Sequence, residues 1–513
     1  MGYIEGQNRN QITLFPEAID DYIGQDSSVR VIDEYIERLD IKKLGFKRAE
    51  PAVTGRPPYN PRDLLKLYIY GYLNRVRSSR RLEQEAGRNL EVIWLLNKLK
   101  PDFKTIADFR KDNKKALTKV FHDFSKLCSD WDLFGKELVA VDGTKFRASN
   151  SKKNNYSKKK LQRLLASIDK RIDNYLKELD QLDEIEKCDR KPDAKEIKKR
   201  LEQLRSRKEK YEGFKKVLED EDSSEISTTD PDARLMSNNN GNVDVSYNVQ
   251  TTVDSKHKLI VDFDVTVQPN DLGQLAKMAV RAKDIFGVDK LEAVADKGYY
   301  KTDDLKTCLE NGITPFVAKQ VYPSRTGVKE FNHDRFAYDK EKDVYICPQK
   351  NVLSRWRVRR AKGQIVGYDY KNWEACKACS FKGDCTKSPK GRTIFRYVDQ
   401  DLLDPIDIKL GDNKSKYKLR QMIVEHPFGT IKRSWGAYYF LTRRKVSVTA
   451  EVALSYLAYN LKRAINVLGA AAIIGLLTKR VRSYGLRGPT ALFFPAQVRT
   501  IGDQGHLSIL CSD

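Results

Sequence analysis

The first part of the chain has the apolar spacing of short helices. Apolar residues recur every three or four positions over residues 29–39, and again from Pro61, which ends a Pro-rich, linker-like stretch at 51–61. Proline is favoured at the first position of a helix, so Pro61 marks a helix start. Three further helical segments are predicted behind it, at residues 82–88, 92–99 and 102–111. We therefore expect an N-terminal segment and linker at 1–58 and an all-helical domain at 59–130.

A second helical pattern, much more charged, covers residues 157–225. Leucine and isoleucine recur there at helical steps among many Lys, Arg, Asp and Glu residues, and the segment Cys188 to Pro192 interrupts the period. This pattern predicts two antiparallel helices joined along a narrow apolar seam. We interpret it as a helical hairpin inserted into another domain, with dimerisation and DNA contact both left open as its role. The following residues, 223–242, are predicted to form a loop.

Apolar runs and alternating positions indicate strands on both sides of this hairpin. Short buried strands are predicted at 139–141, 291–295 and 314–317, and a β-hairpin at 243–267. Helices predicted at 271–285 and 302–309 alternate with them, which is typical of an α/β domain with a mixed sheet. Insertions divide this domain into three parts, at 131–156, 226–320 and 401–480. The second insertion covers 321–400, and a tail without a clear period covers 481–513.

An acidic residue follows the first predicted strand. Asp142 comes directly after the apolar run Val139 to Val141, and the pair Asp142-Gly143 is a strand-ending signal. A carboxylate at the tip of a buried strand is costly unless it is paired, and Lys145 or a metal ion could pair with it. An isolated Asp-Gly more often caps a turn, so this signal needs support from elsewhere in the chain.

Two further acids lie in similar settings. Asp296 follows the strand at 291–295, and Glu425 follows the apolar pair Ile423-Val424. If the three carboxylates converge, each pair at about 4 Å costs up to several kcal/mol, and divalent cations relieve that cost. Carboxylate oxygens suit Mg²⁺ or Mn²⁺, and paired ions of this kind promote phosphodiester cleavage. The remaining acids near the sheet are interpreted as solvated strand or turn residues: Asp244, Asp262, Asp264, Asp271 and Glu292.

Composition indicates a polyanionic partner. Lys and Arg number 95 against 71 Asp and Glu, which gives a net charge of +24 and favours a nucleic-acid partner over a charge that serves solubility alone. Arg80 and Arg81 end an Arg-rich junction between predicted helices, which fits either a DNA-binding module or an ordinary solvated face. The most apolar stretch, 464–477, is shorter than the roughly 20 residues of a membrane span. We interpret it as a buried helix and expect no membrane role.

Four of the eight cysteines fall in the second insertion. Cys376 and Cys379 form a CxxC pair, with Cys347 before it and Cys385 behind it. One CxxC pair and two more thiols can provide the four ligands of a structural Zn²⁺ site. The alternative is that the four cysteines are unrelated reduced thiols. The chain opens on polar residues rather than a signal peptide, so a reducing compartment is expected.

With these motifs in order, the sequence resembles bacterial insertion-sequence transposases of the DDE class with an InsH-like N-terminal region. The first two acids match in the runs Val141-Asp142-Gly143-Thr144 and Ala295-Asp296-Lys297-Gly298-Tyr299. The third matches through the family's spaced signature of Tyr417, Arg420, Glu425 and Lys432. The resemblance implies an RNase H-like mixed sheet with helices, preceded by an all-helical N-terminal domain and carrying the hairpin and the small Cys-rich insertion.

The resemblance also implies a function. Asp142, Asp296 and Glu425 would carry Mg²⁺-dependent cleavage at transposon ends, after which the freed 3′-hydroxyl attacks target DNA. Tyr417, Arg420 and Lys432 would contact DNA, and Lys432 inherits contact with the transposon end. The implied partners are double-stranded DNA and further copies of the chain, as a homodimer or higher oligomer on DNA. The implied location is the nucleoid in the bacterial cytoplasm.

Two departures from the family pattern bear on Glu425. Four residues separate Arg420 from Glu425 where the usual spacing has three, and Pro427 follows two residues later. Proline breaks or kinks a helix interior, so Glu425 is expected at a helix start or a kink. Two other functions fit the same residues: a non-catalytic or domesticated DNA-binding protein with a zinc module, and an RNase H-like nuclease that cuts without joining.

Overall fold

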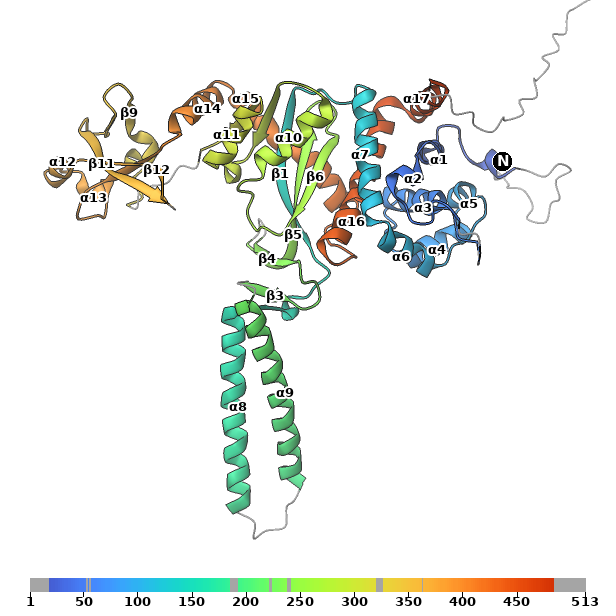
Figure 1. Cartoon of the computed structure of the whole chain (residues 1–513), viewed down its shortest axis with the longest axis horizontal. Helices are drawn as coiled ribbons and strands as arrows, with labels where there is room; N and C mark the ends of the chain where they lie inside the picture. The colour runs from blue at the N-terminus through green and yellow to red at the C-terminus, as the bar shows by residue number, and fades with distance from the viewer. Residues whose placement is uncertain are drawn as a thin grey trace, which may run out of the picture.

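The computed structural model describes residues 18–51, 54, 57–184, 192–220, 224–237, 241–319, 326–361 and 363–483. The predictions for the polar start of the chain, for Cys188 and for the tail from residue 484 lie outside these residues. Figure 1 shows a central α/β domain with three attachments: the N-terminal helices, a long helical hairpin and the second insertion. The Cys-rich insertion and the N-terminal helices lie at opposite ends of the molecule (Figure 1).

The N-terminal region is helical, as expected. Its helices are α1 (Ser28–Glu37), α2 (Ile41–Leu44), α3 (Pro61–Leu73), α4 (Ser79–Arg88), α5 (Leu90–Leu95) and α6 (Phe103–Asp112). The side chain of Asn60 accepts a hydrogen bond from the backbone N–H of Arg62, and Pro61 occupies the first turn of α3, so the predicted start signal is confirmed. Arg77, after α3, reaches the C-terminal part of the chain, where its guanidinium lies 3.6 Å from Glu451.

Two long helices join this region to the α/β domain. Helix α7 (Lys114–Asp130), which the sequence pattern did not single out, packs along α16 (Lys445–Leu468). The single buried helix predicted at 464–477 is wrong, because Gly469 adopts a φ of 83° and separates α16 from α17 (Ala470–Ser483). The two helices meet at 103°. No single helix in the described part of the chain is long and apolar enough to cross a membrane, although this bent pair passes that test together.

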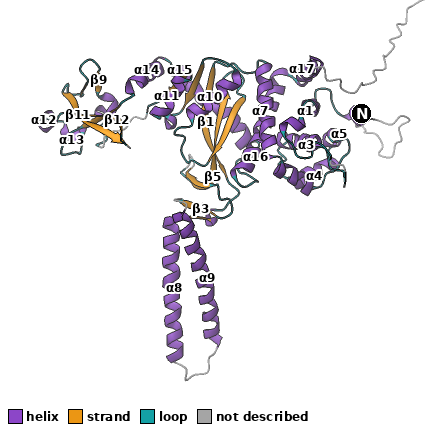
Figure 2. Cartoon of the chain, viewed as in Figure 1, coloured by secondary structure: helices purple, strands orange, loops and turns teal. Residues whose placement is uncertain are grey.

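The central domain holds one mixed sheet of six strands (Figure 2). They are β1 (Leu138–Arg147), β4 (Arg234–Ser237), β5 (Val243–Asp254), β6 (Ile260–Thr266), β7 (Leu291–Ala295) and β8 (Ile313–Val317). Strand β5 is antiparallel to β1, β4 and β6, whereas β7 and β8 run parallel to β1. Helices α10 (Leu275–Phe286), α11 (Thr302–Glu310) and α15 (Lys414–Phe428) pack on this sheet. The RNase H-like mixed sheet is therefore confirmed.

The helical hairpin leaves the sheet after β1. Helices α8 (Lys158–Glu184) and α9 (Pro192–Asp220) run side by side and project away from the domain (Figure 1). Two short strands, β2 (Asn155–Ser157) and β3 (Glu225–Ser227), pair at its base. The loop predicted at 223–242 is wrong in part, because β3 and β4 lie within it. The apolar seam is narrow, and its buried residues are Leu161, Ile168, Leu201, Leu204 and Leu218.

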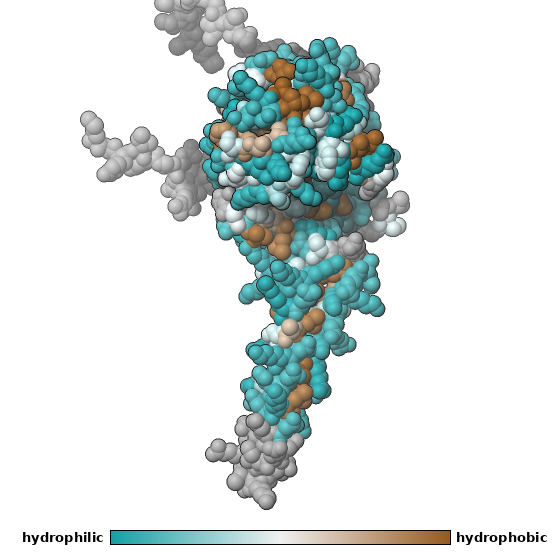
Figure 3. All heavy atoms as spheres, turned by 90° about the vertical axis from the view of Figure 1, so that its left-hand side faces the viewer, coloured by the Kyte–Doolittle hydropathy of each residue, from teal (hydrophilic) through white to brown (hydrophobic). Residues whose placement is uncertain are grey.

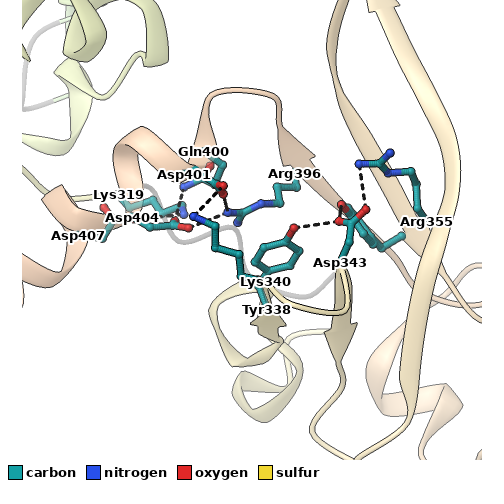
Figure 4. Close-up of polar contacts among 11 residues, drawn as sticks. Lys319, Tyr338, Lys340, Asp343, Arg355, Arg396, Gln400, Asp401, Asp404 and Asp407 are labelled. Atoms are coloured by element: carbon teal, nitrogen blue, oxygen red, sulfur yellow. Dashed lines mark hydrogen bonds and ion pairs between the residues drawn. The ribbon is translucent and has the colours of Figure 1, made fainter. Parts of the chain in front are cut away.

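The second insertion is a small sheet of its own. Its five strands are β9 (Ala337–Asp339), β10 (Val344–Ile346), β11 (Val352–Ala361), β12 (Gln364–Lys371) and β13 (Thr393–Tyr397), with short helices α12 (Trp373–Lys377) and α13 (Lys382–Cys385). Helix α14 (Gln400–Asp412) follows. Figure 4 shows how the parts are joined: Arg396 on β13 is paired with Asp401 and Asp404 of α14. Lys340 reaches Asp401 at 3.3 Å from the side of β9.

Candidate active site

Asp142 lies inside a strand. The predicted strand end at Asp142-Gly143 is wrong, because β1 continues to Arg147 and both residues pair with β5. A Cβ atom on Gly143 would lie 2.2 Å from Oδ1 of Asp271 and 2.4 Å from Nε2 of Gln250. Glycine in a strand interior often marks a close approach of this kind. Gly143 therefore makes room for two polar side chains and does not form a turn.

The register of the sheet brings the first two acids together. Strands β1 and β7 are parallel, with Ala140 opposite Val294. Asp142 lies two residues beyond Ala140 in β1, and Asp296 lies two residues beyond Val294, just past the end of β7. The alternation of side chains along each strand therefore puts both carboxylates on the same face of the sheet. Asp296 is the first residue after β7, and its Oδ1 accepts a 2.7 Å hydrogen bond from the backbone N–H of Gly298. Strand pairing thus places Asp142, whereas Asp296 is placed by the end of β7 and by the hydrogen bond that it accepts from Gly298.

The third acid comes from α15, which packs against β1 and β7. Glu425 lies in the last turns of this helix, which excludes the helix start and leaves the expected irregularity near Pro427. Pro427 lies inside the helix, and Gly429–Ser434 continue it as a π-helix. Proline provides no N–H for the regular helical pattern, which accounts for the irregular end. The side-chain amide of Gln421, one turn earlier, donates a 2.7 Å hydrogen bond to Oε1 of Glu425.

All three acids line one cavity of about 750 Å³. Its polar lining includes Asp142, Asp271, Asp296, Arg420, Gln421, Glu425 and Lys432. Tyr417 lies on the same helix, but it is not part of this lining. Arg80 and Arg81 are exposed on α4 in the N-terminal region, and the Arg80 guanidinium lies 5.2 Å from the centre of the Phe103 ring.

Asp271 is a fourth carboxylate at this cavity, and the sequence reading missed it. It had been interpreted as a solvated residue that starts a helix, but α10 begins four residues later, at Leu275. Its Oδ1 accepts hydrogen bonds from the side-chain amides of Asn248, at 2.8 Å, and Gln250, at 2.6 Å. Both amides are fully buried on β5. In the sequence, only the alternation of Asn248 and Gln250 on one face of the predicted strand indicated that a polar side chain would pack against that face.

The electrostatics of the cavity are dominated by burial and like charge. Burial raises the pKa of Asp142 to about 7, the Arg420 guanidinium lowers it in part, and Asp296 and Asp271 add to the rise. Nη1 of Arg420 lies 3.8 Å from Oδ2 of Asp142. The expected partner Lys145 does not take this role, because its Nζ donates to the backbone carbonyl of Ser237. One arginine thus faces several carboxylates.

Lys432 is held at the edge of the cavity. Its Nζ donates 2.7 Å hydrogen bonds to Oγ1 of Thr144 and to the carbonyl oxygen of Lys145, and it lies 4.7 Å from the centre of the Phe146 ring. Burial lowers the pKa of Lys432 to about 8, while Asp142 opposes the shift. The lysine therefore ties the π-helix after α15 to β1, the strand that carries Asp142.

The donor set suits a hard divalent cation. Within the described residues, no three His, Cys, Asp or Glu side chains are arranged to hold one metal ion between them. Magnesium often takes only one or two carboxylates and completes its shell with water and substrate phosphate. Asp142 and Asp296 provide two such oxygens. Burial is the main cause of the raised pKa of Asp142, and Asp296 and Asp271 add negative charge that a cation would offset. The residues present therefore fit Mg²⁺ or Mn²⁺.

The four cysteines of the insertion also come together. Cys347, Cys376, Cys379 and Cys385 all line one small cavity, of about 30 Å³, beside the small sheet. Burial raises the pKa of Cys385 to about 11; Arg392 opposes this, and the other three thiols add to it. A structural zinc site usually has four ligands, and four cysteines line this cavity. In the described residues, however, their side chains are not close enough together to hold a metal ion.

Two transposase families match the chain. The family described as Transposase domain (DUF772) matches residues 17–112, and the family described as Transposase DDE domain matches residues 346–465. The second match includes Glu425, whereas Asp142 and Asp296 lie outside it. No curated protein and no solved structure matched the chain.

The two matches identify transposase domains in residues 17–112 and 346–465, and the fold and the acidic cavity agree with them. Together the matches support an insertion-sequence transposase of the DDE class.

Replacing Gly143 by alanine tests the packing of the site. The added methyl group would overlap the side chains of Asp271 and Gln250, so we expect Gly143→Ala to lower the free energy of unfolding by about 1–3 kcal/mol. Gly411→Ala is the matched control, because a Cβ there meets nothing within 4 Å and alanine favours the helix. Urea denaturation followed by circular dichroism measures both variants. Equal stability of the two would contradict the close packing around Gly143.

Proposed function

We propose that this transposase cleaves DNA at transposon ends with Mg²⁺ or Mn²⁺ and joins the freed 3′-hydroxyl to target DNA. The observation that carries the proposal is the convergence of Asp142, Asp296 and Glu425 on one cavity. These acids come from a strand, a strand end and a helix that are far apart in the sequence. The family matches independently indicate a protein that acts on DNA.

The three acids are proposed as the residues that hold the metal. Bound ions of this kind activate the attacking oxygen and stabilise the leaving oxygen of a phosphodiester. Gln421 keeps Glu425 turned toward the cavity through its 2.7 Å hydrogen bond. Arg420 is close enough to Asp142 to limit the repulsion among the carboxylates, and its charge suits a DNA phosphate as well.

This chain has one more residue between Arg420 and Glu425 than the family pattern. As a result, Gln421 and Arg420 contact different carboxylates. Gln421 stands one turn before Glu425 and bonds to it, whereas Arg420 faces Asp142. We infer that Gln421 orients the third acid in this chain. Lys432 orients β1 through Thr144 and the carbonyl of Lys145, in addition to the DNA contact that the family pattern implies.

The proposed partners are double-stranded transposon ends and target DNA. A net charge of +24 favours binding to a polyanion, and the exposed Arg80 and Arg81 on α4 are proposed as phosphate contacts. Tyr417 is proposed as a further DNA contact on α15. We also propose that the chain acts as a homodimer or higher oligomer on DNA, in the nucleoid of a bacterial cell.

Removing any one of the three acids should abolish DNA cleavage. We expect Asp142→Asn, Asp296→Asn and Glu425→Gln each to reduce Mg²⁺-dependent nicking of end DNA at least about a hundredfold, because each removes a charge that holds the metal. Asp303→Asn is the control, since Asp303 is exposed in the first turn of α11 and away from the cavity lining. Gel assays on labelled transposon ends measure cleavage.

Three results of these assays would overturn the proposal. If Asp142→Asn cleaves as fast as the Asp303→Asn control, the cavity is not the active site. If the wild-type protein cleaves ends but joins no 3′-hydroxyl to a target plasmid, the chain is an RNase H-like nuclease. Binding to end DNA without any cleavage in Mg²⁺ or Mn²⁺ would instead favour the non-catalytic, DNA-binding alternative.

A structural Zn²⁺ ion is proposed for the four cysteines of the insertion. Thiolates around one cavity would draw together on a zinc ion, which would stabilise the small sheet beside them. We expect one zinc per chain by elemental mass spectrometry, and less than half of that in Cys379→Ser. Cys511→Ser, outside the described residues, is the control and should keep its zinc. Zinc-free wild-type protein with unchanged thermal stability would refute the site.

A further inference from the structure

Strand β11 is exposed although strands flank it on both sides. It pairs with β10 and β12, yet along its ten residues only Leu353 is buried. The small core of the insertion lies under the first part of β11, and the ribbon formed by β11 and β12 extends beyond it. Figure 3 views the molecule from the side of this insertion, where separate apolar patches lie among polar residues.

A β-bulge turns a tryptophan outward on this ribbon. Arg355 pairs with Tyr370 and Arg357 with Asp369, so Trp356 is an extra residue without a partner on β12. Bulges of this kind redirect side chains and often lie at functional sites. Trp356 is 59 % exposed, and Trp373, just after β12, is 47 % exposed.

A lysine stands between the two exposed rings. Nζ of Lys371 lies 4.9 Å from the centre of the Trp356 ring and 5.3 Å from that of Trp373. Arg357 pairs with Asp369, which is two residues from Lys371 and therefore on the same side of β12. We call Trp356, Arg357, Lys371 and Trp373 the tryptophan face.

The cations of this face are not neutralised by the insertion itself. Arg355 and Arg359 are occupied by Asp343, at 2.9 Å, and by Asp369, at 2.8 Å. In the part of the chain that the structure describes, no ion pair to a carboxylate is formed by Arg357 or Lys371. Two exposed aromatic rings with the unpaired Lys371 between them, and Arg357 on the same side of the ribbon, are complementary to a phosphodiester strand, because phosphates bind the cations and bases stack on the rings.

We propose that the tryptophan face binds a DNA strand. The inference rests on the proposed function, because it takes the bound nucleic acid to be the DNA that the protein cleaves or joins. The face is firmly linked to the active-site cavity: Arg396, on the strand next to β12, is paired with Asp401 and Asp404 on α14 (Figure 4). Helix α14 packs in turn on β8 and α11 of the central domain, and α15, the helix of Glu425, follows it after one residue. DNA held by this face is therefore held in a defined position relative to the cavity.

Binding measurements without divalent metal separate this inference from catalysis. The full chain is titrated onto a labelled duplex and onto a labelled single strand of the same sequence, and fluorescence anisotropy is recorded between about 50 and 200 mM salt. We expect Arg357→Glu with Lys371→Glu to weaken binding at least about tenfold and to lower the salt slope by about two. Lys342→Glu with Lys350→Glu, on the turns before and after β10, makes the same change in charge and should alter binding far less.

The tryptophans separate stacking from charge. We expect Trp356→Ala with Trp373→Ala to weaken binding about tenfold while the salt slope stays unchanged, because stacking releases no counterions. A larger loss on the single strand identifies unpaired bases as the ligand, and an equal loss on both probes identifies the duplex.

Three results would overturn the inference. The first is an equal loss in the Arg357/Lys371 and Lys342/Lys350 double variants. The second is unchanged binding of both probes by the tryptophan double variant. The third is a wild-type dimer that light scattering shows to dissociate in the tryptophan variant while DNA binding is kept, since the face would then join two copies of the chain. A wild-type protein that binds neither probe would contradict the proposed function itself, which distinguishes the two failures.

Discussion

The parallel pairing of β1 with β7 is the constraint on which the site depends. With Ala140 opposite Val294, the backbone brings Asp142 and the end of β7, where Asp296 lies, to the same cavity. The two carboxylates line the same cavity and repel each other, and the pKa of Asp142 rises to about 7 through burial and its acidic neighbours. The other polar residues of the cavity stabilise these carboxylates in the folded chain.

Neutral amides and one lysine provide most of that support. Asn248 and Gln250 extend from β5 and donate to Asp271, and Tyr299 in turn donates to Oε1 of Gln250 at 2.5 Å. Hydrogen bonds to a charged acceptor are roughly twice as strong as neutral ones, so these buried contacts fix Asp271 without adding positive charge. Lys432 ties the π-helix to β1. The sheet thus positions Asp142 and Asp296. Glu425 lies near the end of α15, and the π-helix that follows is attached to β1 through Lys432.

Local periodicity was enough to predict much of the fold. The N-terminal helices, the hairpin α8–α9 and the order of strands and helices in the mixed sheet all follow from spacing within short windows. Contacts between distant segments were not predictable in this way. Gly143 looked like a turn, because the side chain of Asp271 that needs its space lies 128 positions away in the sequence. Asp271 itself looked solvated, since its partners come from β5. The break at Gly469 was not predicted either, because it depends on the positive φ of this glycine, and the spacing of apolar residues gives no information on φ.

A diffraction experiment tests the central claim most directly. Crystals of the transposase grown with Mn²⁺ and a short duplex of its own transposon end, measured at a wavelength with manganese anomalous signal, locate each bound ion. The account predicts an anomalous peak in contact with the carboxylates of Asp142 and Asp296, on the side of the cavity that Glu425 faces, with Arg420 moved off Asp142. Manganese found only elsewhere on the chain, with Arg420 still against Asp142 and DNA in the cavity, would contradict it.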